Sequence, residues 1–492
     1  MAHEHTRSSR LGVMSALLGV AWLCLACACT MEPRYRAPAM PVPDQWPIPA
    51  TTPEATPVAP DANTVAARDI GWRDFFVDAN LQRLIAAALA NNRDLRVAVL
   101  NIERARAQYR IQRAAELPSI DATGSFTREK LPPSLTFGTT SFTGNIFQAG
   151  VGISAFEVDL FGRVRSLTHA ALEQYLAQEQ ARRSAQLSLI AEVANAYLTL
   201  ASDRELQRLA QQTLQSQEAS FELSQKSHTA GTTSGLDLAQ AQTTVEQARA
   251  DAARYEGNVA QDIDALTLLV GAAVDPAWLP EQFDSKTMGL DALPAGLPSG
   301  VLLRRPDVLE AEHTLRAANG NIGAARAAFF PEISLTANIG SASEQLASLF
   351  KAGTGAWTFM PQATLPLFHG GQLRGNLAVA HVDQQIALAQ YEKAIESGFR
   401  EVADALALTA TLNRQRAAQE ALVAATSRAY DLSQQRYKAG RDSYLVVLDS
   451  QRSNYAAQQG LIATRLAEQS NRVGLYEALG GGWREQSQSQ SP

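Results

Sequence analysis

The chain contains two copies of a long helical hairpin, and this duplication limits the folds open to it. Residues 372–438 include no proline and are rich in Ala, Leu, Gln and charged residues, which predicts one helix about 100 Å long at 1.5 Å per residue. A tight turn around Gly440 then leads into a second helix. Residues 166–228, a turn around Gly231 and residues 237–270 repeat the pattern. Helices of this length do not fit inside a compact core, so we expect a duplicated, helix-walled architecture.

Aligning the copies defines their bounds. A shift of 209 residues places Gly162 on Gly371, and further upstream a shift of 213 residues places Pro118 on Pro331. Each copy reads helix, strand, loop, strand, long helix, tight turn and shorter helix, and the first helix is expected over about residues 81–117. The predicted divisions are a first repeat at 76–271 with its turn at 229–235, a linker at 272–303, a second repeat at 304–480 with its turn at 439–444, and a tail at 481–492.

The N-terminus predicts export from the cytoplasm. Two arginines precede an apolar run of about 16 residues that ends in small residues. This run is typical of a secretory signal, here assigned to residues 1–28, and it is too short to span a membrane. The three cysteines, Cys24, Cys27 and Cys29, all lie near its end. The mature chain therefore has no disulfide framework.

The small residues before Cys29 resemble a bacterial lipobox, whose cysteine is acylated and becomes the first residue of the mature chain. Acylation at Cys27 and cleavage without lipid are the alternatives. We expect a diacylglycerol and an acyl group (palmitate) on Cys29 and no other cofactor. Residues 29–75 then form a lipidated tether, whose proline-rich part cannot form a helix or a central strand and should lie extended over the surface.

Between the helices the hydrophobic period changes to two, which indicates strands with one apolar and one polar face. In the second strand, Phe147, Val151 and Ala155 are assigned to the apolar face and Gln148 to the polar face. Strands of about ten residues suit a tilted crossing of a bilayer, and aromatic residues near their ends suit interfacial girdles. A soluble sheet covered by helices is the alternative. The predicted strands lie at about 119–128, 146–158, 332–340 and 356–367.

Four strands cannot close a barrel, and an open edge in lipid leaves backbone groups unpaired, so other subunits must complete the sheet. Two chains give eight strands and a filled interior, whereas three give twelve strands and room for a channel. The sequence therefore predicts an α+β homotrimer with a 12-stranded transmembrane β-barrel, four strands per chain. A long α-helical barrel continues it, with a mixed equatorial belt formed by the linker and the tail.

Other patterns do not predict chemistry. The glycine pattern at residues 150–155 lies inside a strand, the seven histidines show no metal-ligand spacing, and a net charge of −6 gives no case for nucleic acid. Arg304 to Asp307 predict a helix start, with Pro306 in its first turn, rather than an anion site. We predict no enzyme activity and no metal site.

Four stretches, residues 29–35, 156–162, 304–311 and 444–452, are specific to one family. In these stretches the sequence resembles the TolC-like outer membrane factor family, and specifically its lipoprotein (NodT-type) branch, which serves resistance-nodulation-division efflux pumps. The resemblance covers nearly the whole mature chain. It implies a trimeric channel in the outer membrane with a large periplasmic part, whose closed tip opens when a periplasmic adaptor and an inner membrane transporter dock.

The two hairpins differ in charge just after their turns. Asp449 and Arg452 correspond, 209 residues earlier, to Gln240 and Thr243. Spacing alone favours a solvated surface pair. The resemblance implies instead that Leu445, Asp449 and Arg452 line the periplasmic gate. It also implies adaptor contacts at the two turns, at Gly231, Ser234, Gly440 and Ser443.

The patterns and the resemblance together imply the outer membrane exit duct of a tripartite efflux pump, a passive channel that expels drugs or other small toxic compounds. A metal-ion efflux channel and a type I protein secretion channel are alternatives of the same class. A non-transporting envelope scaffold built from coiled coils is an alternative of another class. Because a passive duct selects only by size and charge, substrate choice should lie in the pump.

The lipid prediction is tested by replacing Cys29 with Ser. Only this thiol is predicted to carry the diacylglycerol, so the C29S chain should lack acyl groups while the wild-type chain carries them. Mass spectrometry of the mature N-terminus measures the difference. A wild-type N-terminus without lipid would show that the lipobox interpretation is wrong.

Overall fold

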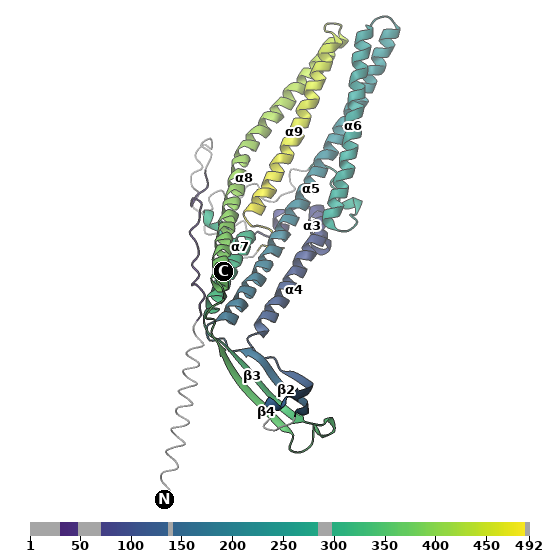
Figure 1. The fold of residues 1–492 in the computed structure, drawn as a ribbon. Helices are drawn as coiled ribbons and strands as arrows, with labels where there is room; N and C mark the ends of the chain where they lie inside the picture. Colours follow the sequence, from purple (N-terminus) through teal and green to yellow (C-terminus); the bar gives the residue numbers. More distant parts are fainter. Residues whose placement is uncertain (1–29, 48–69, 136–140, 284–297, 488–492) are drawn as a thin grey trace. The chain divides into compact units, whose positions relative to one another are not determined.

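The computed structural model describes residues 30–47, 70–135, 141–283 and 298–487 (Figure 1). The predicted signal peptide and Cys29 lie outside the described residues. In chain order the elements are α2 (Trp72–Phe75), α3 (Ala79–Asn91), α4 (Arg93–Ala114), β1 (Asp121–Leu131), η2 (Pro133–Leu135), β2 (Phe142–Glu157), α5 (Arg163–Thr229), α6 (Gly235–Val270), η3 (Pro276–Trp278), η4 (Ser299–Arg304), α7 (Pro306–Ala327), β3 (Glu332–Ser343), η5 (Leu346–Ser348), β4 (Gly355–Thr364), α8 (Gln372–Lys438) and α9 (Tyr444–Ala478).

The chain divides into two compact units, and each unit contains parts of both sequence repeats. The first, called the sheet unit, comprises Met1–Ala39, Asn101–Glu179 and Glu310–Tyr391; the second, called the hairpin unit, comprises Met40–Leu100, Gln180–Leu309 and Glu392–Pro492. The repeats are therefore units of sequence and not of folding. Elements of one copy pack against elements of the other copy inside each unit.

The sheet unit contains one antiparallel sheet in the order β1-β2-β3-β4. Its register aligns Ala122, Val151, Ile339 and Trp357 in one row across the four strands. The last three side chains of this row are 48%, 70% and 76% exposed. Within the chain, the sheet thus has a face of large apolar side chains that no described element covers, as a lipid-facing surface requires.

The sheet differs from the predicted alternation at one position in β2. Ala155 adopts a positive φ of 51°, and the register with β3 shifts between Ile153 and Phe156. This β-bulge inserts one residue, so Phe156 takes the apolar face that the pattern assigned to Ala155. The assignment of Ala155 was wrong because the Ala155 N–H leaves the ladder and donates to the Thr336 hydroxyl, 3.2 Å away.

The first helix was also predicted wrongly as a single element. It is two helices, α3 and α4, that separate at Asn92. The Asn92 side chain accepts a hydrogen bond from the Leu95 amide at 2.8 Å, which caps α4, and donates to the Leu269 carbonyl at 2.9 Å, which ties the break to α6. The Asn92 side chain, which caps α4 and also bonds to a residue far away in the sequence, thus ends α3 in the middle of the predicted helix.

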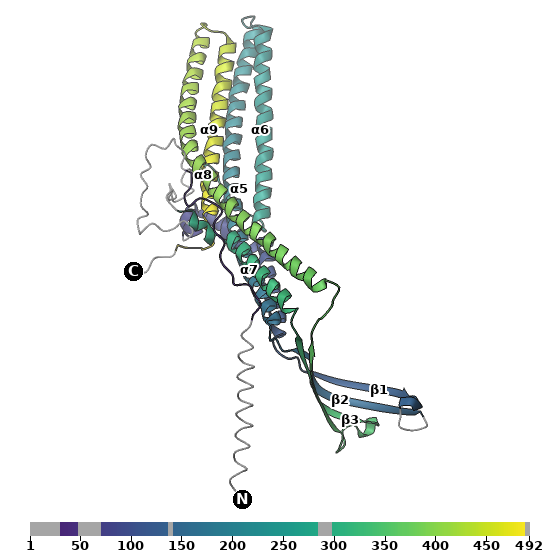
Figure 2. The ribbon, with the colours of Figure 1, turned by 60° about the vertical axis from the view of Figure 1, so that its left-hand side comes forward.

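The hairpin unit contains the distal parts of α5 and α8 with all of α6 and α9. Helices α5 and α8 have 67 residues each, and α6 and α9 have 36 and 35. Figures 1 and 2 both show α5 beside α6 and α8 beside α9. Among the described helices, none combines the length and the apolar character that a membrane-crossing helix needs.

Part of the core of the hairpin unit lies where residues 70–76 meet the C-terminal segment. Tyr476 stacks on Phe75 with ring centroids 3.9 Å apart, and its hydroxyl donates to the Ile70 carbonyl at 2.7 Å. The C-terminal segment then pairs with α2, since the Trp72 amide donates to the Arg484 carbonyl at 3.0 Å. Trp72 and Phe75 are 2% and 1% exposed. The described part of the tail therefore packs against α2, and its first two residues, Gly481 and Gly482, are buried.

The two faces of the sheet make a testable difference. Replacing Val151 with Arg on the apolar face should cost about 2–4 kcal/mol in the stability of the inserted sheet if the site lies near a bilayer midplane. Arg at the exposed Gln148 on the other face should be tolerated. Heat-modifiability gels of protein refolded into lipid measure the folded fraction.

V151R and Q148R are a matched pair of variants, because Val151 and Gln148 lie close together on β2 and both precede the bulge. Thr336 on β3 is a poorer control, because its hydroxyl caps the bulge. Equal loss of folded protein in V151R and Q148R would contradict the assignment of the faces.

Candidate functional site

The two hairpin turns share one backbone conformation. Gly231 and Gly440 have φ values of 75° and 67°, a left-handed conformation that favours glycine. Each glycine amide donates to the carbonyl three residues back, at 2.9 Å and 2.8 Å, and each following amide donates to the carbonyl five residues back, at 2.9 Å in both turns. These are the bonds that end a helix at a glycine. The tips are thus geometric copies of each other.

The residues after the two glycines differ in polar contacts. Ser234 caps α6, since its hydroxyl oxygen accepts from the Asp237 amide at 3.1 Å. Ser443 occupies the same place before α9 but forms no side-chain cap with the described residues. Instead Arg436 donates twice to Asp442 across the second turn, at 2.6 Å and 2.9 Å. This hydrogen bonding lowers the pKa of Asp442.

Sequence reasoning missed the Arg436–Asp442 pair. Its equivalents in the first hairpin are Ser227 and Thr233, which carry no charge. The comparison of the two repeats singled out Asp449 and Arg452 because their equivalents are uncharged. The same comparison would have singled out Arg436 and Asp442. The second tip therefore differs from the first by two charged pairs rather than one.

The predicted gate residues lie on one exposed face of α9. Arg452 donates to Asp449 at 2.7 Å within the helix, and their side chains are 81% and 66% exposed. Leu445, one turn earlier, is 56% exposed. The structure thus brings Asp449 and Arg452 together in a solvated pair, and Leu445 lies beside them on the same helix.

The opposite face of α9 holds the two hairpins together. Tyr444 and Val447 are buried with Ala241 of α6 in an apolar cluster, and burial raises the pKa of Tyr444 to about 12. Further along, Gln459 donates to the Tyr255 hydroxyl at 3.1 Å. The cluster is completed by the partly buried Phe221, Tyr430, Tyr437 and Leu448.

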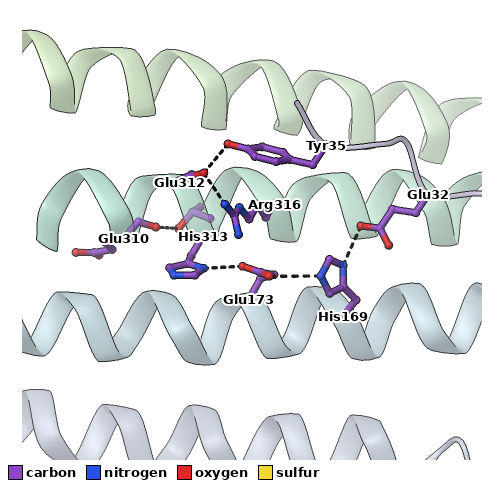
Figure 3. A network of polar contacts seen from close by, with 9 residues as sticks. Glu32, Tyr35, His169, Glu173, Glu310, Glu312, His313 and Arg316 are labelled. Carbon is purple, nitrogen blue, oxygen red and sulfur yellow. Dashed lines mark hydrogen bonds and ion pairs between the residues drawn. The ribbon is translucent and has the colours of Figure 1, made fainter. Parts of the chain in front are cut away.

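A second polar site, called the tether seat, lies in the sheet unit (Figure 3). It comprises Glu32 and Tyr35 of the N-terminal tether, His169 and Glu173 of α5, and Glu312, His313 and Arg316 of α7. Glu173 bridges the two helices. Its carboxylate lies 3.4 Å from Nε2 of His169 and 2.6 Å from Nδ1 of His313.

The tether binds to both sides of this bridge. Glu32 lies 2.8 Å from Nδ1 of His169. Tyr35 donates to Glu312 at 2.9 Å, and the Arg316 guanidinium lies 4.8 Å from the centre of the Tyr35 ring. A Cβ at Gly323 of α7 would lie 2.9 Å from the Glu32 Cα, so glycine lets the tether backbone lie directly on the helix.

The charges of the seat stabilise one another. Hydrogen bonds to Glu173 and Glu32 raise the pKa of His169 to about 10, so the imidazole is cationic at neutral pH. Burial acts to raise the pKa of Glu173, but hydrogen bonds from His169 and His313 outweigh it and lower the pKa to about 2. His169 and Glu173, at the centre of the seat, therefore carry opposite charges throughout the physiological range.

Arg305 occupies the predicted helix start, and its charge is fully used within the fold. Its guanidinium donates to Asp307 at 3.0 Å and 2.8 Å, to the Ala478 carbonyl at 2.7 Å, and pairs with Glu401 at 2.9 Å. Helix α7 begins at Pro306. Arg305 thus joins α7, α8 and the end of α9, as expected for a structural cluster rather than an anion site.

In the part of the chain that the structure describes, no group of three or more His, Cys, Asp or Glu side chains is arranged to hold a metal ion.

An antiparallel sheet with an uncovered apolar face, combined with two matching pairs of long helices, defines a class of channel-forming envelope proteins.

Comparison with known proteins identifies the family. The model of the outer membrane efflux protein family matches residues 84–272 and 297–481, so the chain belongs to this family. The antibiotic efflux pump outer membrane protein ArpC of Pseudomonas putida is 49% identical over 93% of this chain and 94% of the relative. The solvent efflux pump outer membrane protein SrpC of Pseudomonas putida is 46% identical over 92% of this chain and 96% of the relative.

A solved structure agrees with this assignment. The open state of the MtrE outer membrane channel of Neisseria gonorrhoeae has a TM-score of 0.82 and 38% identity, and the match covers 94% of this chain and 100% of that one. The resemblance to the outer membrane factors and the predicted outer membrane location are thereby confirmed. Cys29, the gate residues and the adaptor-contacting turns stay predictions.

The tether seat predicts how docking of the N-terminal segment depends on pH. Because the pKa of His169 is raised from 6.5 to about 10, its contribution is complete below about pH 6.5 and is lost as the pH rises through 10. Because the pKa of Glu173 is lowered from 4.5 to about 2, its contribution is present above pH 4.5 and is lost as the pH falls through 2. Hydrogen-exchange protection factors of the Glu32, Arg34 and Tyr35 amides should therefore fall at both extremes.

The matched variants are H169Q and H381Q. His381 belongs to the same unit, and its side chain forms no hydrogen bond with a described residue. H169Q should lower protection at neutral pH and remove the loss at high pH, whereas H381Q should change neither. Unchanged protection in H169Q would show that Glu32 does not hold the tether.

Proposed function

We propose that the protein is the trimeric, passive exit duct of a tripartite efflux pump, completed by a periplasmic adaptor and an inner membrane resistance-nodulation-division transporter. The observation that carries the proposal is the sheet, which has four strands, two edge strands and an exposed apolar face. Such a sheet is unstable in lipid unless its edges pair with other strands. Pairing of β1 of one copy with β4 of the next supplies this closure.

Three copies give the number of strands that leaves a channel open. Eight strands enclose an interior filled by side chains, whereas larger barrels enclose water. The polar face of the sheet, which includes Ser125 and Gln148, then lines the passage. Membership of the outer membrane efflux protein family supports a conduit over the non-transporting scaffold.

The exposed face of α9 supports a gate at the helical tips. Its buried face is used for packing within the chain, whereas Leu445, Asp449 and Arg452 have no packing role there. In a trimer these side chains meet their symmetry copies around one axis. Three Asp449 carboxylates repel one another unless each is paired, so closure depends on Arg452, and the ring favours cations.

The remaining parts follow from the same arrangement. The two matching turns, at Gly231 with Ser234 and at Gly440 with Ser443, present the contacts for the adaptor. An acylated Cys29 lies three residues before Glu32, so the tether seat holds the lipid anchor close to the sheet unit. The names of the relatives ArpC and SrpC support antibiotics and organic solvents as the exported compounds.

Single-channel recording tests both the duct and its gate. Wild-type protein purified in detergent should sediment as a trimer and conduct weakly, with a preference for cations. Asp449→Ala, Arg452→Ala and Leu445→Ala should each raise the conductance, because closure loses a paired charge or an apolar contact. The same variants should admit bulky hydrophilic antibiotics into cells that lack the pump.

The repeat supplies the control. Gln240 is the equivalent of Asp449 in the first hairpin, and Gln240→Ala should leave conductance unchanged. Wild-type conductance and ion preference in D449A and R452A would exclude these residues as the gate. A trimer that conducts in none of the variants would favour the scaffold.

A further inference from the structure

Strand β1 separates a run of three charged residues onto two faces. Arg128, Glu129 and Lys130 are consecutive, and β1 pairs with β2 without a register shift from Asp121 to Leu131. Because side chains alternate along a strand, Arg128 and Lys130 share the face of Phe126, and Glu129 lies on the opposite face. A nearly neutral sequence thus becomes a surface with two cations and no anion.

This cationic surface continues the apolar face. Phe126 stacks on its cross-strand partner Phe147 with ring centroids 4.5 Å apart, and Phe126 is 56% exposed. The next two rows on the same face pair Arg128 with Asn145 and Lys130 with Thr143. Each row lies about 7 Å beyond the last. The face therefore changes from aromatic to cationic within one row.

The two cations are not used by the fold. Neither Arg128 nor Lys130 forms an ion pair with a described residue, and both side chains are exposed. Residues 132–141, which join β1 to β2, include no carboxylate. By contrast, Arg163 at the other end of the sheet is paired with Glu157.

The position of the cations in the sheet suggests their surroundings. Helices α4 and α7 lead into β1 and β3, and α5 and α8 follow β2 and β4, so all four helices join one end of the sheet. Arg128 and Lys130 lie toward the other end, near the strand connections. If the sheet spans the outer membrane as in the proposed function, this end faces the cell exterior.

We propose that Arg128 and Lys130 form a docking surface for the phosphorylated headgroup of an outer-leaflet lipid. Aromatic side chains occupy the boundary between acyl chains and headgroups, which places the cations at phosphate depth. A guanidinium binds two phosphate oxygens at once, and an ammonium adds a second positive charge. Glu129, which would repel a phosphate, is kept on the other face. The bound lipid stabilises β1, an edge strand of the chain, within the wall.

The inference rests on the proposed function for the orientation of the sheet. Its test uses wild-type protein, the double variant R128Q/K130Q and the control E129Q, each placed in phosphatidylcholine nanodiscs that contain bisphosphorylated lipid A. Native mass spectrometry after release from the disc measures retained lipid A. Wild-type protein and E129Q should retain it. The double variant should retain it on the order of 25-fold less tightly, since each basic residue at an anionic membrane surface contributes about fivefold.

Two further arms identify the ligand chemistry. Wild-type protein should retain lipid A that lacks its phosphates only weakly. This retention should be no greater than the retention of bisphosphorylated lipid A by the double variant. Inorganic pyrophosphate added to detergent-solubilised protein should bind far more weakly than bisphosphorylated lipid A. Equal retention by wild type and R128Q/K130Q, or equal retention of phosphate-free lipid A, overturns the inference. Equally tight pyrophosphate binding also overturns it, in favour of a site for soluble anions.

Conductance of the same preparations separates this inference from the proposed function. If the wild-type channel conducts but lipid retention does not depend on Arg128 and Lys130, only the inference is wrong. A wild-type preparation that does not conduct defeats the proposed function. Circular dichroism of the three proteins confirms that loss of lipid A is not loss of the fold.

Discussion

Backbone pairing between β2 and β3 is the contact on which the sheet depends, because it joins strands from the two sequence repeats. The two backbones lie close together at Gly152 of β2 and Gly340 of β3. A Cβ at Gly152 would lie less than 3.0 Å from the Ala337 carbonyl oxygen, and a Cβ at Gly340 would lie less than 3.0 Å from the Ala149 carbonyl oxygen. Glycine is thus required on both strands, and neither repeat forms this sheet unit alone.

The same contact explains the glycine pattern at residues 150–155, which resembles a dinucleotide-binding loop only in its letters. Gly150 and Gly152 admit the neighbouring backbone of β3, and Ala155 forms the bulge. The bulge raises the local twist where β2 leaves the sheet toward α5. Among the described strands, β1 and β4 each pair on one side only, so the twisted sheet of four strands has two open edges within its own chain.

The parts of the fold set by local sequence could be predicted, and those set by distant partners could not. The bounds of α8 match the prediction because a proline-free run ends at a left-handed glycine. The break at Asn92 depends on Leu269, and the tether seat joins Glu32 to His169, 137 residues away. No periodicity in one sequence reveals such pairs. The Arg436–Asp442 pair was within reach, since it spans only one turn.

Duplication and divergence have separate effects at the helical tips. The turns at Gly231 and Gly440 have the same hydrogen bonds, so the backbone geometry of the tips was kept while their charges changed. Two pairs of charges whose equivalents in the first hairpin are uncharged, Arg436 with Asp442 and Asp449 with Arg452, form within one chain. Exposed pairs of this kind contribute little to stability, so their charges were free to change without loss of the fold. In the proposed trimer, symmetry copies that exclude water from the tips would place the same pairs in a lower dielectric, so an electrostatically minor difference between two hairpins would become a property of the whole assembly.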